Sequence, residues 1–328
     1  MRRLRALMAV VVSLGLVACT GPAPEPTTPA PTVAARSTPA PTPTPTPTPT
    51  PSPTPADPLP AGPLNVLLIG TDSRDPASLG GNADTVLLVH LPADRAQVYL
   101  ISFTRDMWVP IPGVGEGKLN AAFARGGTPT LVETVSGLLG GAPIDATVQT
   151  NFAGFIALTR ALGGFEVDNR HHSTVTVQST GRVVDFPEGR ITLSGTDGLI
   201  YVRERKRLPL GDLDRTERQR AALVGMLARV GELADDPVAL ATLLPHVVGN
   251  VKVTGVLEAQ DVAGLVPLAR TFGRDDVVGL MAPITGFGNR GGASVNVVDD
   301  ARMAELGAAV RADDVGGYVA RHGTDYAP

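Results

Sequence analysis

Basic side chains are concentrated between Tyr201 and Arg220, a stretch that holds seven of the chain's 28 Lys and Arg residues. If residues 199–205 form a strand, successive side chains point to opposite faces, so Arg203 and Arg205 point the same way. Two guanidinium groups would then stand side by side. A solvated basic surface is the alternative interpretation of such a charge cluster.

The residues that follow predict a helix. Pro209 and Gly211 turn the chain, and residues 215–233 have helical spacing, with Arg215 and Gln219 on one face. Strand and helix would together bring three Arg and one Gln to one point. Because Arg is always charged and presents a planar fork of donors, the expected ligand is a multiply charged oxyanion such as a diphosphate.

Two acids are the candidate metal ligands. Asp72 follows the apolar run 65–70, and Asp84 begins the apolar run 84–91. Mg²⁺ is typically held by one or two carboxylates together with substrate phosphate oxygens and water, and two acids flanking a strand pair can provide that. A turn or capping role is the alternative for an Asp in a strand-end loop.

Three further charged residues lie near strand ends. Arg105 and Asp106 follow the apolar run 98–103, and Arg74 shares a loop with Asp72. Open α/β sheets bind ligands at strand ends, so an Arg at this edge would add a guanidinium to the anion site. An Arg-Asp ion pair on a loop is the alternative.

Alternating strand-like and helix-like segments must position these residues. Apolar runs predict strands at 65–70, 84–91, 98–103, 144–150, 277–280 and 294–298. Helical spacing predicts helices at 118–139 with a break at Gly126-Gly127, and at 152–162, 215–233, 237–248, 262–272 and 299–311. Residues 171–191 alternate in places and predict a hairpin-like insertion. This order indicates an α/β domain with helices on both faces of a sheet.

The helix predicted at 152–162 has an apolar stripe. Phe152, Phe155, Ile156 and Leu158 recur at helical spacing. We interpret them as core residues, with a groove for a lipid tail as the alternative.

The N-terminal residues are expected to lie outside the fold. A basic start and a short apolar run precede Leu16-Val17-Ala18-Cys19, which resembles a lipoprotein signal whose Cys is acylated and becomes the new N-terminus. An ordinary secretory signal is the alternative. The Pro/Thr-rich residues that follow cannot bury enough apolar surface to fold, and at ~3.1 Å per residue they reach on the order of 100 Å. We therefore divide the chain into a signal peptide (1–18), a disordered linker (19–63), a folded domain (64–315) and a C-terminal tail (316–328).

Composition and motif tests exclude several classes of function. The net charge of −4 argues against nucleic-acid binding. Cys19 is the only cysteine, which excludes an intramolecular disulfide or a thiolate zinc cluster. The segment 113–118 lacks the spacing and the Ser or Thr of a nucleotide phosphate loop. Ser194-Gly195 lacks the pattern of a nucleophile elbow.

Several blocks of sequence occur in a fixed order over about residues 64–315. They are Asn65–Arg74, Ala83–Thr85, Ser102–Asp106, Lys118–Asn120 with Gly126-Gly127, Ala161–Gly164, and Tyr201–Gln219. In these blocks the chain resembles the LytR-CpsA-Psr proteins of bacterial cell envelopes. The resemblance implies a three-layer α/β/α domain with a mixed central sheet, which transfers a glycopolymer from a polyprenyl-diphosphate carrier to peptidoglycan.

The resemblance also implies roles for residues. Asp72 and Asp84 would hold Mg²⁺, and the prenyl tail would lie in an apolar tunnel. The diphosphate binders would be Arg105, Arg203, Arg205, Arg215 and Gln219, with Arg74 less directly implicated. Arg105, Asp106 and Arg203 are the expected catalytic residues, and either Asp106 or Asp84 would serve as the base. One departure is Asn82, which stands where the family usually has Arg and would weaken catalysis or shift substrate preference.

Three hypotheses of function remain at this point. The first is a magnesium-dependent phosphotransferase that attaches a glycopolymer to peptidoglycan, lipid-anchored through Cys19 at the extracytoplasmic face of the cell membrane. The second is a polyprenyl-diphosphate phosphatase that uses the same site. The third is a non-catalytic envelope protein that binds polyprenyl diphosphate, motivated by Asn82. We expect a monomer that binds no nucleic acid.

Overall fold

A computed structural model describes residues 59–75, 77–257 and 266–324 of the chain. Its central sheet has six strands in the order β11-β6-β1-β2-β3-β12. They are β1 (Leu64–Thr71), β2 (Ala83–Leu91), β3 (Val98–Phe103), β6 (Ala146–Thr150), β11 (Lys252–Gly255) and β12 (Val277–Met281). The pairs β1·β6 and β3·β12 are parallel and the others antiparallel. The sheet is therefore mixed, as expected.

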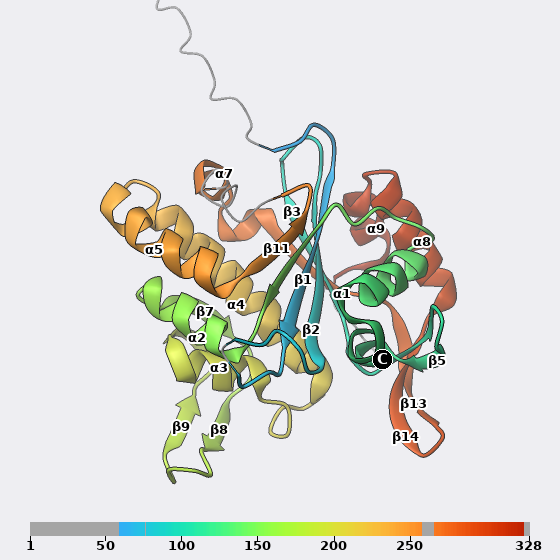
Figure 1. Ribbon diagram of the computed structural model, residues 1–328, viewed down its shortest axis with the longest axis horizontal. Helices are drawn as coiled ribbons and strands as arrows, with labels where there is room; N and C mark the ends of the chain where they lie inside the picture. The colour runs from blue at the N-terminus through green and yellow to red at the C-terminus, as the bar shows by residue number, and fades with distance from the viewer. Residues whose placement is uncertain (1–58, 76, 258–265, 325–328) are drawn as a thin grey trace, which may run out of the picture. The chain divides into compact units, whose positions relative to one another are not determined.

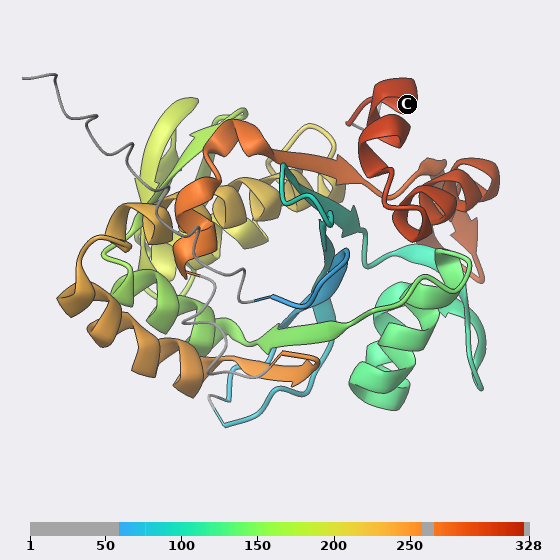
Figure 2. The same ribbon diagram turned by 90° about the horizontal axis from the view of Figure 1, so that it is seen from above.

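Helices cover both faces of this sheet, as Figures 1 and 2 show. On one side lie α2 (Phe152–Ala161), α3 (Gly195–Arg203), α4 (Asp212–Leu233), α5 (Pro237–Asn250) and α7 (Val266–Thr271). On the other lie α1 (Leu119–Leu138), α8 (Asp300–Arg311) and α9 (Val315–His322). The short helix η1 (Arg274–Asp276) leads into β12. The predicted α/β architecture is confirmed.

Strand β1 is buried on both faces. Leu67 and Ile69 belong to the core cluster that includes α1, α8 and α9 residues, whereas Val66 and Leu68 pack with the cluster on the α4 side. Alternate side chains of one strand thus serve two cores. This double burial explains why the strand reads as an unbroken apolar run.

Three smaller sheets flank the central one. The largest has the order β13-β14-β4-β5, with β4 (Met107–Ile111), β5 (Gly115–Lys118), β13 (Ile284–Arg290) and β14 (Ala293–Val298). Two antiparallel pairs join β7 (Phe165–Asn169) with β10 (Gly189–Leu193), and β8 (Ser173–Thr176) with β9 (Val183–Phe186). The second pair is the hairpin predicted within residues 171–191.

The strand predicted at 199–205 is wrong, because Gly195–Arg203 is the helix α3. Its buried residues are Gly195, Gly198, Tyr201 and Val202, which recur at helical rather than alternate spacing. Gly198 lies on the packed face of this helix, since a Cβ there would make ordinary van der Waals contact with ring atoms of Phe155 and Phe165 at 3.6 Å. A four-residue apolar run is too short to distinguish the two periods.

Other boundaries agree with the sequence to within a few residues. The break predicted at Gly126-Gly127 appears at Gly127, whose φ of 65° and ψ of −157° are non-helical. The C-terminal boundary is an exception: the predicted end of the domain at residue 315 is wrong, because helix α9 continues the domain to His322 and its Tyr318 is buried in the core.

The expectations for the signal peptide, for Cys19 and for the linker up to residue 58 lie outside the described residues. Residues 59–63, which we placed in a disordered linker, are described, and Leu59 is buried in a core cluster, so the folded domain begins earlier than predicted. Within the described ranges, no helix has both the length and the apolar character needed to cross a bilayer.

Candidate functional site

The predicted acids and Arg105 come to one edge of the central sheet because β1, β2 and β3 are antiparallel neighbours. Thr71 at the end of β1 pairs with Ala83 at the start of β2. Val86 pairs with Phe103 at the end of β3. Asp72, Asp84 and Arg105 lie next to these pairs and are therefore neighbours in space. The order of the strands in the sheet brings them together.

Arg105 reaches this edge through Asp84. Its Nη1 donates to Oδ1 of Asp84 at 2.6 Å, and both side chains are mostly buried. Burial disfavours the charge of Arg105, but the hydrogen bond and the acids Asp84, Asp212 and Asp106 outweigh burial and raise the pKa of Arg105. Asp84 thus holds a permanently charged guanidinium at the edge.

Asp72 is oriented by Asn82. The backbone N–H of Asn82 donates to Oδ1 of Asp72 at 2.7 Å, and its side-chain Nδ2 donates to Oδ2 at 3.0 Å. Burial tends to raise the pKa of Asp72, but these hydrogen bonds and the charge of Arg203 outweigh burial and lower that pKa. Asn82, a departure from the expected Arg, therefore fixes the direction of a candidate metal ligand.

Arg203 lies at the C-terminal end of α3, with its guanidinium carbon 4.1 Å from the centre of the Phe152 ring. Burial lowers the pKa of Arg203, as do the nearby charges of Arg74 and Arg105, while Asp84 and Asp72 oppose the shift. Both candidate metal ligands thus act on one guanidinium. An anion at this point would relieve the crowding of positive charge.

Helix α4 supplies two more polar groups on one face. Arg215 is 4% exposed and Gln219 9% exposed, and both line the same cavity as Asp84 and Arg203. Gln219 donates from Nε2 to the Val202 carbonyl at 3.3 Å. The predicted (i, i+4) placement is therefore present, with Gln219 tied to α3.

Asp212, which the sequence analysis missed, is a third acid at the site, beside Asp72 and Asp84. Its Oδ1 lies 2.9 Å from Nη2 of Arg215, 3.9 Å from Nη1 of Arg205 and 4.0 Å from Nε of Arg105. Asp212 opens α4, three residues before Arg215, whereas the predicted helix began at Arg215. The sequence did contain a signal for this role. Asp212 is an acid at a helix start, and Arg215 follows it at the i+3 spacing that allows an ion pair.

Five predicted residues do not line the cavity. Two of them, Asp72 and Arg105, are described above, and the other three are Arg205, Asp106 and Arg74. Arg205 follows α3 in a largely exposed position and contacts Asp212, so it does not stand beside Arg203 on a strand. Asp106 accepts a hydrogen bond from Nζ of Lys118 at 2.7 Å. Arg74 is exposed in the loop after β1. Arg205 and Arg74 can act on a bound anion only from its periphery.

A cavity of about 270 Å³ extends from the charged residues into the protein. Its mouth carries Asp84, Arg203, Arg215 and Gln219, and its interior is lined mainly by apolar side chains. Phe152, Phe155 and Leu158 are among them, so the apolar stripe of α2 faces a cavity, which was the alternative to a core role.

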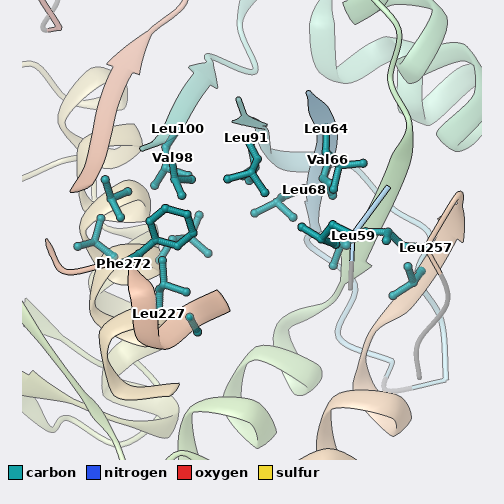
Figure 3. Close-up of a pocket in the computed structure, with 17 residues that line it drawn as sticks. Leu59, Leu64, Val66, Leu68, Leu91, Val98, Leu100, Leu227, Leu257 and Phe272 are labelled. Atoms are coloured by element: carbon teal, nitrogen blue, oxygen red, sulfur yellow. The ribbon is translucent and has the colours of Figure 1, made fainter. Parts of the chain in front are cut away.

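A second cavity of about 280 Å³ adjoins the first, and all the described residues that line it are apolar (Figure 3). Leu68, Val148 and Leu223 line both cavities. The pair occupies the space between the central sheet and α4 and α7. On α4 the same stripe that begins with Arg215 and Gln219 continues with Leu223 and therefore turns from charged to apolar along one helix.

The residues at the edge fit a hard divalent cation. Asp72 and Asp84 offer carboxylate oxygens, and both influence the same guanidinium of Arg203. Mg²⁺ prefers such oxygens and usually shares them with substrate phosphates. The donor set contains no thiolate or imidazole, so it suits Mg²⁺ better than zinc.

A separate cluster joins His171 to the α4 residues Asp214 and Glu217, whose possible ligand atoms lie within 4.8 Å of one another. Protein groups already engage both acids. The Leu210 N–H donates to Asp214 at 2.7 Å, and Nε of Arg170 lies 3.0 Å from Glu217. We interpret this cluster as a link between α4 and the loop that leads to the β8–β9 hairpin.

Comparison with known proteins places these features in context. The model of the LytR_cpsA_psr family matches residues 41–310. A polyisoprenyl-teichoic acid–peptidoglycan teichoic acid transferase, TagU of Enterococcus faecalis, is 38% identical over 170 residues, which is 51% of this chain and 54% of TagU. The cell wall biosynthesis protein LcpA of Corynebacterium glutamicum is 27% identical over 286 residues, 73% of this chain and 54% of LcpA. The chain spans about half the length of these curated relatives.

Solved structures share the fold. B. subtilis TagV superposes with a TM-score of 0.67 at 23% identity, covering 78% of this chain and 98% of TagV. TagT bound to LIIa-WTA superposes with a TM-score of 0.61 at 26% identity, covering 77% of this chain and 91% of TagT.

Proposed function

The chain belongs to the LytR_cpsA_psr family, and from this premise we propose that it transfers a glycopolymer from a polyprenyl-diphosphate carrier to peptidoglycan. The observation that carries the proposal is the junction of a cationic mouth with an apolar interior. Arg203 and Arg215 stand where the first cavity opens, and the walls behind them become apolar. A lipid diphosphate has the same division between a charged head and an apolar tail.

Each polar residue at the mouth has a role in this proposal. Arg203, Arg215 and Gln219 bind the diphosphate, since they line the cavity and offer donors suited to phosphate oxygens. Arg105 adds positive charge from behind Asp84. Asp72 and Asp84 would hold Mg²⁺, which supplies charge neutralisation at the diphosphate oxygens.

The proposed reaction is a phosphoryl transfer. A hydroxyl oxygen of peptidoglycan forms a bond to the phosphorus that carries the glycan, and the bond from that phosphorus to the bridging oxygen breaks. The carrier leaves as polyprenyl phosphate, and the hydroxyl proton passes to a base. Positive groups fixed around the diphosphate stabilise the charge that develops on the leaving oxygen. Asp84 is the nearer candidate base, because it lines the cavity and Asp106 does not.

We also propose that Cys19 is acylated and holds the protein at the extracytoplasmic face of the membrane. The proposal rests on the lipobox-like sequence Leu16–Cys19. Such an anchor would keep the site near a carrier lipid whose tail is embedded in the bilayer.

A transfer assay tests the proposed function. A polyprenyl-diphosphate glycan and peptidoglycan are incubated with Mg²⁺ and with wild type or Arg203→Ala. Removing a charge that stabilises the diphosphate should slow transfer on the order of 100-fold. Arg290→Ala, in the exposed β13–β14 hairpin, is the matched control and should transfer at the wild-type rate.

The same assay separates the alternatives. Equal transfer by Arg203→Ala and wild type would refute the site assignment. Release of polyprenyl phosphate without any acceptor would identify a phosphatase, and tight lipid binding without turnover at any Mg²⁺ concentration would identify a binding protein.

A further inference from the structure

The guanidinium of Arg95 binds the segment that precedes β1. Arg95, in the turn between β2 and β3, donates from Nη1 to the Gly62 carbonyl at 2.8 Å and from Nη2 to the Pro60 carbonyl at 2.7 Å. Its Nη1 also donates to the Pro92 carbonyl of its own turn at 2.7 Å. The segment Leu59–Gly62, here called the strap, is thereby fixed to the β2–β3 turn.

The strap places Leu59 in the wall of the apolar cavity shown in Figure 3. The Leu59 side chain is 8% exposed and packs in the same core cluster as Leu64 and Leu91. The apolar side chain of Leu59 is buried, and the backbone that follows it is hydrogen-bonded to Arg95, so the strap forms part of the cavity wall.

Leu59 lies at the end of the sheet opposite the charged mouth. Leu64 pairs with Leu91 at one end of β1, and Thr71 pairs with Ala83 at the other, next to Asp72 and Asp84. Seven residue steps at ~3.3 Å each separate the two ends by roughly 23 Å. Only a long lipid tail that starts at the mouth extends this far.

We infer that the strap forms a wall for the distal part of the lipid tail and that Leu59 is a residue that selects for tail length. The inference rests on the proposed function, because it assumes that a prenyl diphosphate binds with its head at Arg203 and Arg215. Leu68, Val148 and Leu223, which line both cavities, provide the continuous apolar path between head and strap. A short tail ends before Leu59, whereas a long tail contacts it.

Binding of two lipids by the full-length protein tests this inference. Affinities for farnesyl diphosphate and undecaprenyl diphosphate are measured with Mg²⁺ in the same detergent, for wild type and Leu59→Trp. The larger ring should fill space that the long tail needs and weaken undecaprenyl diphosphate binding about tenfold. Farnesyl diphosphate should bind with the wild-type affinity.

A second substitution examines the role of the Arg95 hydrogen bonds. In the double variant Leu59→Trp with Arg95→Ala the strap is released, so Trp should leave the cavity and the affinity for undecaprenyl diphosphate should recover. Leu257→Trp is the matched control, since Leu257 lines the same cavity from a segment outside the three Arg95 hydrogen bonds described above. Its loss of affinity should persist when Arg95→Ala is added.

Three results would overturn the inference. They are unchanged undecaprenyl diphosphate binding by Leu59→Trp, an equal loss for both lipids, and recovery by Arg95→Ala that is the same for Leu59→Trp and Leu257→Trp. If wild type binds neither lipid, the proposed function itself is refuted, and the inference with it.

Discussion

At the scale of residues, the site depends on acids that hold cations in place. Arg215 is nearly buried, and Asp212 at 2.9 Å offsets the cost of placing its charge there. Burial raises the pKa of Asp212, although the charges of Arg215 and Arg105 oppose the shift. Asp212 therefore acts as a positioning residue that prearranges guanidinium groups before an anion arrives.

Asp212→Asn should destabilise the free protein by about 3 kcal/mol, because Arg215 loses its charged partner in a buried position. Inorganic diphosphate should restore more stability to this variant than to wild type, since the anion replaces the lost negative charge. Urea unfolding with and without inorganic diphosphate measures both effects.

Asp197→Asn is the matched control for this prediction. Asp197 pairs with Arg182 at an exposed position, where loss of the ion pair costs about 0–1 kcal/mol. A loss of stability in Asp212→Asn no larger than in Asp197→Asn would contradict the role assigned to Asp212.

At the scale of elements, helix α4 connects the site to the fold. Its first turns carry Asp212, Arg215 and Gln219, and the following turns carry Leu223 and Met226 into the first cavity. Because one helical stripe contains all of these residues, the head and the tail of a lipid diphosphate would lie along one rigid element.

The position of α4 depends on a close approach to β7. Gly225 lies in the middle of the helix, and a Cβ added there would lie 2.1 Å from the Glu166 carbonyl oxygen. That oxygen belongs to the backbone of β7 and cannot rotate away. A side chain at residue 225 must therefore push α4 outwards and disturb both the site and the cavities.

Gly225→Ala should lower the free energy of unfolding by about 1–3 kcal/mol, as expected for overpacking, and the melting temperature should fall with it. Gly137→Ala in α1 is the control, because nothing lies within 4 Å of a Cβ at residue 137. There the better helix propensity of Ala should stabilise the protein by about 0.5–1 kcal/mol. Equal melting temperatures for the two variants would show that the contact with β7 does not constrain α4.

At the scale of the whole domain, the two faces of the central sheet serve different purposes. The face toward α1, α8 and α9 packs as a core in which Leu67, Leu88 and Leu306 are fully buried. The face toward α4 encloses the two apolar cavities. The domain thus stabilises itself on one side of the sheet and keeps space for an apolar ligand on the other.

This division predicts that head and tail contribute separately to binding. Inorganic diphosphate should raise the melting temperature through the mouth alone, and farnesyl diphosphate should raise it further because its tail fills apolar space. In Leu223→Gln a polar group enters the cavity wall. The affinity for farnesyl diphosphate should then fall about tenfold more than the affinity for inorganic diphosphate.

Leu243→Gln provides the comparison, since Leu243 is buried in α5 but lines neither cavity. In this variant the ratio of the affinity for farnesyl diphosphate to the affinity for inorganic diphosphate should equal that of wild type, even if the variant is less stable. A wild-type ratio in Leu223→Gln would mean that the tail does not enter these cavities.

Local pattern was enough to determine many features of this protein. Apolar runs identified the strands that carry Asp72, Asp84 and Arg105 to their ends, because a strand buried on both faces must be apolar throughout. Spacing of four placed Arg215 and Gln219 on one helix face. The order of the sequence blocks identified the family.

Only the tertiary structure decided the rest, because it depends on contacts between segments that are distant in sequence. Residues 199–205 lie mainly in a helix end and its following loop, and the apolar run there is too short for its spacing to distinguish a helix from a strand. Asp212 gains its role from Arg105, which is remote along the chain. The cavities arise between the sheet and α4, and Leu59 lines one of them next to backbone carbonyls that Arg95 binds. Sequence thus determined which residues carry charge and which form strands, and folding decided which of them share one site.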